Sequence, residues 1–104
     1  MDEKTPHQWL LVVLPKAKDV FDKFSQTNKQ GMFRRLEQLL VADNPYLLPF
    51  LDMLQEPKYE RARRFRVGDF RVLIIVETEE VEHQTHTYRG TLFVIKIGDR
   101  KDVY

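Results

Sequence analysis

Basic side chains gather in one short stretch of this chain, where they are the first sign of chemistry. Between Pro57 and Arg71, six lysines and arginines stand against two acidic residues, a local charge of +4 in a chain of 104 residues whose net charge is +1. Arginines grouped in this way suit a phosphate ligand, because each guanidinium holds phosphate oxygens through two parallel hydrogen bonds. A single arginine on a sheet more often covers apolar surface with its stem and keeps its head in water.

Counting outward from Gly68-Asp69 predicts where these arginines point. If these two residues form a tight hairpin loop, Arg66 stands directly opposite Arg71. Side chains alternate between the two faces of a strand, so one face carries Phe65, Val67, Phe70, Val72, Ile74 and Val76. The other face carries Arg64, Arg66 and Arg71. A like-charge pair across two strands destabilises a sheet, and a sequence that tolerates one favours a bound anion.

The last strand, expected at 91–97, repeats this alternation. Its apolar residues of one parity are Phe93, Ile95 and Ile97. Lys96 has the other parity, which Arg100 shares, so we expect both to join the arginines on the uncovered face. Asp99 then points away from that face.

The elements that position these side chains follow from apolar periodicity. Residues 8–14 form a short apolar run that predicts a strand with both faces covered or nearly so, and Pro15 begins an amphipathic helix. After a polar turn at 25–28, a second helix is expected over about 29–42. Its apolar face consists of Met32, Phe33, Leu36, Leu39 and Leu40.

The remainder of the chain is expected to be mostly strand. Three strands are predicted, at 61–67, 70–77 and 91–97, and the polar segment 81–88 is predicted to be an exposed loop or the tip of a longer hairpin. The sequence therefore predicts a single α+β domain spanning residues 1–104. Two N-terminal helices should pack on one face of a mostly antiparallel sheet of about four strands.

Composition excludes several classes of function. With no cysteine, the chain has no disulfide, no thiolate zinc site and no thiol nucleophile. No apolar run approaches the roughly 20 residues of a membrane-spanning helix, and residues 1–8 lack a signal-peptide pattern, so we expect a cytoplasmic protein without membrane contact. His83 and His86 lie near glutamates, but scattered histidines in a polar loop are common, so no metal and no cofactor are expected.

Two motifs in the arginine-bearing strands resemble those of a known family. Residues 66–72 read RVGDFRV, and residues 97–104 read IGDRKDVY. Together with the order of elements they resemble the RelE/ParE superfamily of small toxins. The resemblance implies a RelE-like fold and, for RelE-like members, ribosome-dependent cleavage of messenger RNA through the substrate's own 2′-hydroxyl. It also implies a cognate antitoxin as partner, with a hetero-oligomer between the two.

The resemblance carries over to individual residues. Arg71 matches the arginine thought to stabilise the transition state, Arg100 the arginine proposed to serve the leaving oxygen, and Tyr104 a tyrosine near the nucleophile or stacked on a base. Arg64 and Arg66 match positions that hold the RNA backbone, and the parity of Lys96 adds it to the RNA-binding set. Two departures are visible: Asp99 stands where the family often has histidine, and the segment 78–90 is long for the family.

Two other functions remain open on the same resemblance. A ParE-like toxin would inhibit DNA gyrase without cutting nucleic acid, and a degenerate member would serve only as a binding module. The set of Arg71, Arg100 and Tyr104 favours RNA cleavage, because a gyrase inhibitor has no need of groups that stabilise phosphoryl transfer.

Overall fold

The structure, a computed structural model, describes residues 6–53 and 61–99. Its elements follow in the order β1 (Trp9–Val13), α1 (Pro15–Asp22), α2 (Gln26–Val41), the 3-10 helix η1 (Pro45–Leu47), β2 (Asp52–Met53), β3 (Arg63–Val67), β4 (Phe70–Glu77), β5 (Val81–His83), β6 (His86–Tyr88) and β7 (Gly90–Asp99). The predicted α+β class is confirmed. No helix in these two described ranges is long and apolar enough to cross a membrane.

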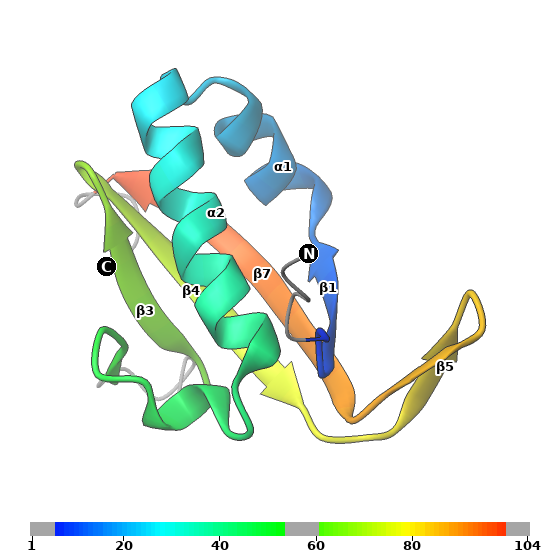
Figure 1. The fold of residues 1–104 in the computed structure, drawn as a ribbon. Helices are drawn as coiled ribbons and strands as arrows, with labels where there is room; N and C mark the ends of the chain where they lie inside the picture. The colour runs from blue at the N-terminus through cyan, green and yellow to red at the C-terminus, as the bar shows by residue number, and fades with distance from the viewer. Residues whose placement is uncertain (1–5, 54–60, 100–104) are drawn as a thin grey trace, which may run out of the picture.

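One mixed sheet carries both helices on the same face (Figure 1). Its strand order is β1-β7-β4-β3-β2, with β1 parallel to β7 and the other neighbours antiparallel. β4 and β7 form the long central pair. β5 and β6 pair only with each other, as a separate ribbon that projects beyond the ends of β4 and β7 (Figure 1). The polar segment 81–88 is thus the hairpin tip that the sequence allowed.

β1 is less covered than predicted. It lies at the edge of the sheet and pairs only with β7, so of its five residues Trp9 alone is buried. The Trp9 indole donates a hydrogen bond of 2.8 Å to the Ala42 carbonyl oxygen, which ties the strand to the end of α2. The strand was predicted to have both faces covered or nearly so, and its other four residues are partly buried, because a continuous apolar run does not distinguish an edge strand from a central one.

α2 begins three residues earlier than predicted. The Ser25 hydroxyl accepts a hydrogen bond of 3.1 Å from the Asn28 backbone N–H, so the polar segment 25–28 is a helix cap and first turn, not a separate loop. The apolar face is confirmed apart from Phe33, which is 57% exposed and stacks edge-on against Phe21.

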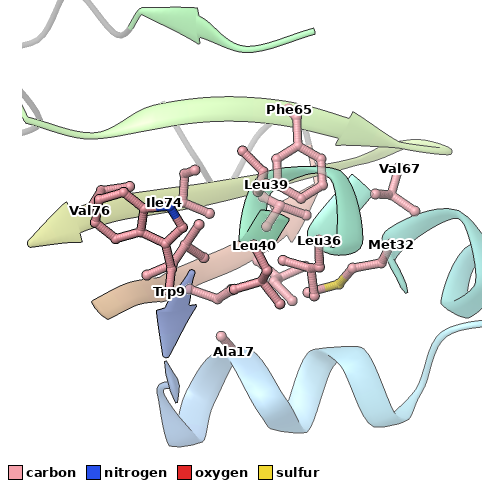
Figure 2. Close-up of a cluster of buried hydrophobic side chains, with 14 of the residues drawn as sticks. Trp9, Ala17, Met32, Leu36, Leu39, Leu40, Phe65, Val67, Ile74 and Val76 are labelled. Carbon is pink, nitrogen blue, oxygen red and sulfur yellow. The ribbon is translucent and has the colours of Figure 1, made fainter. Parts of the chain in front are cut away.

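The core lies between the helices and the covered face of the sheet (Figure 2). Met32, Leu36, Leu39 and Leu40 of α2 are all buried and face the strands. The strands contribute Phe65, Val67, Val72, Ile74, Val76, Leu92, Val94 and Ile97. This apolar layer holds α2 against β3 and β4, and so fixes which sheet face is left for the arginines.

The β3–β4 hairpin has the predicted register. Val67 pairs with Phe70, and Arg66 stands directly opposite Arg71. Gly68 has a φ of +58°, and a Cβ there would lie 2.7 Å from the Asn28 side-chain oxygen, so the turn needs glycine for both reasons.

A β-bulge in the central pair corrects the predicted alternation of β7. Leu73 pairs with Lys96 but Ile74 pairs with Val94, so Ile95 is an extra residue in β7. Ile97 faces the helices as expected, whereas Ile95 packs with Leu73 on the opposite face. Phe93 pairs with Ile75 and also lies on the opposite face. The single parity predicted for Phe93, Ile95 and Ile97 was wrong, because one inserted residue reverses the alternation beyond it.

We expect one substitution, glycine to alanine, to have opposite effects at two positions. At Gly90, opposite Trp9, a Cβ would overlap the Glu77 carbonyl oxygen, so Gly90→Ala should lower the free energy of unfolding by about 3 kcal/mol or more. At Gly31, inside α2, a Cβ would make an ordinary contact of 3.6 Å with Val67, so Gly31→Ala should raise that free energy by about 0.5–1 kcal/mol. Urea unfolding followed by circular dichroism measures both. Equal effects at the two sites would contradict the strand packing described here.

Candidate functional site

The sheet face opposite the helices carries four basic residues in two neighbouring rows, and we call it the basic face. In one row Arg66 of β3 is opposite Arg71 of β4, which is opposite Gly98 of β7. The next row consists of Arg64, Leu73 and Lys96. Strands in a sheet lie about 4.8 Å apart, so these four cationic side chains start within a patch about 10 Å wide. The structure thus brings together Arg64, Arg66, Arg71 and Lys96, as predicted.

Arg71 is far less exposed than its position on this face predicted. Its residue surface is only 6% exposed, while Arg66 beside it is exposed. Glycine at position 98 leaves no side chain on the other flank of Arg71. A guanidinium in such a place acts in a lower dielectric than water, where it interacts more strongly with a developing negative charge.

Arg64 has a carboxylate neighbour that the sequence did not reveal. Asp52 of β2 stands opposite Arg64, and its Oδ2 atom lies 3.6 Å from Nη2 of the arginine. The Arg64 side chain is 13% exposed and that of Asp52 54%. Because the carboxylate already engages this guanidinium, Arg64 is less available to a phosphate than Arg66.

A small apolar cluster adjoins the basic residues. Ala62 and Leu73 are fully buried on this face, and Ile75 and Ile95 pack against them half-buried. Leu73 stands between Arg64 and Lys96 in its row. The face therefore combines cationic groups with apolar surface, which suits a ligand that has both a charged backbone and flat rings.

Two arginines of the basic stretch have structural roles instead. Arg61 forms an ion pair of 2.7 Å with Glu77, and its guanidinium lowers the pKa of that carboxyl by hydrogen bonding and by charge. Arg63 lies over the Tyr46 ring at 4.6 Å, on the helix side of the sheet. The Tyr46 hydroxyl donates to the Arg61 carbonyl oxygen and accepts from the Val76 N–H. These contacts tie η1 to β3 and β4.

The remaining predicted residues follow Asp99 in the sequence. Arg100 and Tyr104 lie outside the described residues. Asp99 pairs with Phe70, which packs on the helix side, so its side chain points away from Arg71 as its parity predicted. Asp99 is therefore on the opposite side of the sheet from the basic face.

A groove that the sequence did not predict lies between α2 and the β3–β4 turn. It has a volume of about 480 Å³, and Arg34, Arg35 and Arg66 are among its lining residues. The available signal was the helical spacing of Thr27, Gly31 and Arg34, which places them on one side of α2. That spacing predicts a shared helix side but not the hairpin turn that faces it.

Metal ligands do not gather in the part of the chain that the structure describes. Within it, no group of three or more histidine, aspartate or glutamate side chains is placed to hold a metal ion. His83 and His86 pair across the β5–β6 ribbon and are exposed.

Comparison with models of known protein families and with curated protein sequences gives no match for this chain. The likeness to RelE/ParE toxins therefore rests on the residues of the two motifs and on the order of the elements.

Proposed function

We propose that this protein is the toxin of a toxin–antitoxin pair and cleaves messenger RNA on the ribosome, in the cytoplasm. The observation that carries this proposal is the pair of arginines, Arg66 and Arg71, held directly opposite each other on the basic face. Like charges directly opposite each other repel across a sheet, and a phosphate bound beside the two guanidinium groups would reduce that repulsion. The phosphodiester backbone of RNA supplies such an anion.

The proposed reaction takes its nucleophile from the substrate. The ribose 2′-oxygen attacks the adjacent phosphorus and loses its proton, a new O2′–P bond forms, and the P–O5′ bond breaks. The leaving 5′-oxygen takes up a proton. The upstream fragment then ends in a 2′,3′-cyclic phosphate, and the downstream fragment begins with a free 5′-hydroxyl.

Each basic residue has a role in that reaction. Negative charge grows on the phosphate oxygens in the transition state, and a fixed, shielded guanidinium stabilises it more than it stabilises the ground state. Arg71, the most buried of the four, is assigned that role. Arg64, Arg66 and Lys96 hold the backbone, while Arg100 and Tyr104, which lie beyond the described residues, are proposed to serve proton transfer and the leaving oxygen.

The proposed partner is an antitoxin with an acidic or amphipathic segment. Such a segment would cover the basic face and exclude RNA from it, because opposite charge attracts it and the cluster around Leu73 offers apolar contact.

We expect Arg71→Ala to lower the rate of message cleavage by about 10²–10³-fold, the loss typical of one removed oxyanion donor. Arg71→Lys keeps the charge but not the two parallel hydrogen bonds, so its rate should fall between those of the wild type and Arg71→Ala. Primer extension on ribosome-bound message measures the rates. Arg89→Ala is the control, because Arg89 lies apart from the basic face and bonds Gln8 and Asp43. Because Arg71 is buried, thermal unfolding of each variant is also measured. A folded Arg71→Ala variant that cleaves the message at the wild-type rate would refute the proposed role of Arg71 in stabilising the transition state.

The chemical nature of the products tests the reaction itself. Cleavage should persist in the presence of EDTA, provided that enough magnesium is added separately to keep the ribosomes intact. The upstream product should carry a cyclic phosphate and the downstream product a free 5′-hydroxyl. A message with a 2′-deoxy sugar at the cleaved position should be bound but not cut. End-labelling and mass spectrometry identify the ends. If messages stay intact with and without ribosomes while gyrase is trapped on cleaved DNA, the RNase proposal fails and the gyrase alternative stands.

The antitoxin contact is expected to be electrostatic. Reversing two charges of the basic face, Arg66→Glu with Lys96→Glu, should weaken binding of the proposed antitoxin by about tenfold, equivalent to about 1.4 kcal/mol. The control reverses Lys16 and Lys18 on α1, on the other side of the sheet. Titration calorimetry over a range of salt concentrations measures both. An affinity for the antitoxin that changes neither with salt concentration nor with either pair of charge reversals would contradict binding at the basic face.

A further inference from the structure

The groove between α2 and the β3–β4 turn is built from two elements that the core fixes relative to each other. Arg34 and Arg35 lie on its α2 side, and Arg66 and Gly68 on its hairpin side. A Cβ on Gly31 would be 3.6 Å from Val67 Cγ1, and a Cβ on Gly68 would be 2.7 Å from the Asn28 side-chain oxygen. The shape of the groove therefore depends on close packing between α2 and the β3–β4 hairpin.

Its charge is positive throughout. Among the described residues, three arginines line the groove and no carboxylate does. Neither Arg34 nor Arg66 forms an ion pair within residues 6–53 and 61–99. Asn28 and Gln30 add amide groups to the same lining. This set of donors fits an extended anion better than a single ion, because its groups are spread along the groove.

Arg35 is held in place by contacts within the protein. Its guanidinium lies 4.5 Å from the centre of the Phe50 ring, and its Nη1 atom is 3.4 Å from the Gln38 side-chain oxygen. Arg34 is exposed and points to the same groove. One guanidinium is thus fixed by stacking while the next along the helix is accessible to a ligand.

Arg66 joins this groove to the basic face. By register it shares the sheet face of Arg71, and it also lines the groove at the end of β3. Arg66 therefore belongs both to the basic face and to the groove that contains Arg34. We propose that the groove binds the phosphodiester backbone of RNA at a second contact, beside the proposed cleavage site. The choice of RNA as ligand rests on the proposed function.

Salt dependence of RNA binding tests this contact. The probe is a fluorescein-labelled oligouridylate with 2′-O-methyl sugars, which the proposed reaction cannot cut, and binding is followed by fluorescence anisotropy. For single strands the slope of log K against log salt changes by about 0.7 per phosphate contact. Arg34→Gln should lower the slope by about 0.7 and weaken binding about fivefold at about 0.1 M salt. Arg34→Lys should retain most of the slope.

The matched control removes a charge from the same helix outside the groove. Lys29 lies 5.7 Å from the Phe21 ring centre, away from the groove lining, so Lys29→Gln should leave the slope unchanged. If Arg34→Gln and Lys29→Gln behave alike toward both the free oligonucleotide and ribosomes, the inference is overturned.

Two further comparisons distinguish message from ribosomal RNA as the ligand, and distinguish the groove contact from the proposed cleavage. An effect of Arg34→Gln on the free oligonucleotide assigns the groove to the message strand. An effect only on co-sedimentation with ribosomes assigns it to ribosomal RNA, and both results support a phosphodiester ligand. Should the wild-type protein cut no message while Arg34→Gln still lowers the slope, the proposed cleavage fails and the groove contact stands.

Discussion

The extra residue in β7, Ile95, determines which side chains reach the basic face. Beyond the bulge, Lys96 and Gly98 lie opposite Leu73 and Arg71 on that face, while Ile97 turns into the core. If Ile95 instead took a regular place in the ladder opposite Leu73, the alternation of the strand would turn Lys96 toward the helices and Ile97 toward the arginines. The central β4–β7 pair thus sets the composition of both faces at once. Bulges of this kind often lie beside functional sites because they redirect a side chain without breaking the sheet.

The opposed arginines are a second constraint on the sheet. Arg66 and Arg71 repel each other across β3 and β4, yet Arg71 is almost fully buried. Burial of a cation in a protein is unfavourable unless other groups compensate for its lost hydration. Arg71 has an interaction partner within the protein, so its burial is compatible with a role in packing. In the proposed cleavage, the same burial would strengthen the interaction of Arg71 with a transition state that gains negative charge.

The sequence predicts those features that depend on neighbours along the chain. The Gly68-Asp69 loop has only two residues, so its length alone fixes the register that places Arg66 opposite Arg71. The start of α2 was predicted too late because polar residues favour both turns and helix caps. The hydrogen bond from the Asn28 backbone N–H to the Ser25 hydroxyl shows that this segment is a helix cap. The bulge, the burial of Arg71 and the ion pair of Arg64 depend on contacts between strands. Periodicity within one strand carries no information about them.

The position of Arg66 follows from how short β2 is. Among the described residues, β2 pairs with β3 only at Arg63 and Arg64, so the last part of β3 is an edge of the sheet there. Where the two strands pair, Asp52 forms an ion pair with Arg64. Past that point no strand lies beside Arg66 in the described chain, and α2 approaches from the other side of the sheet to form the groove. On the basic face, β3 therefore carries one arginine with a carboxylate neighbour, Arg64, and one exposed arginine, Arg66. The accessible arginine is the one that stands both opposite Arg71 and in the groove with Arg34.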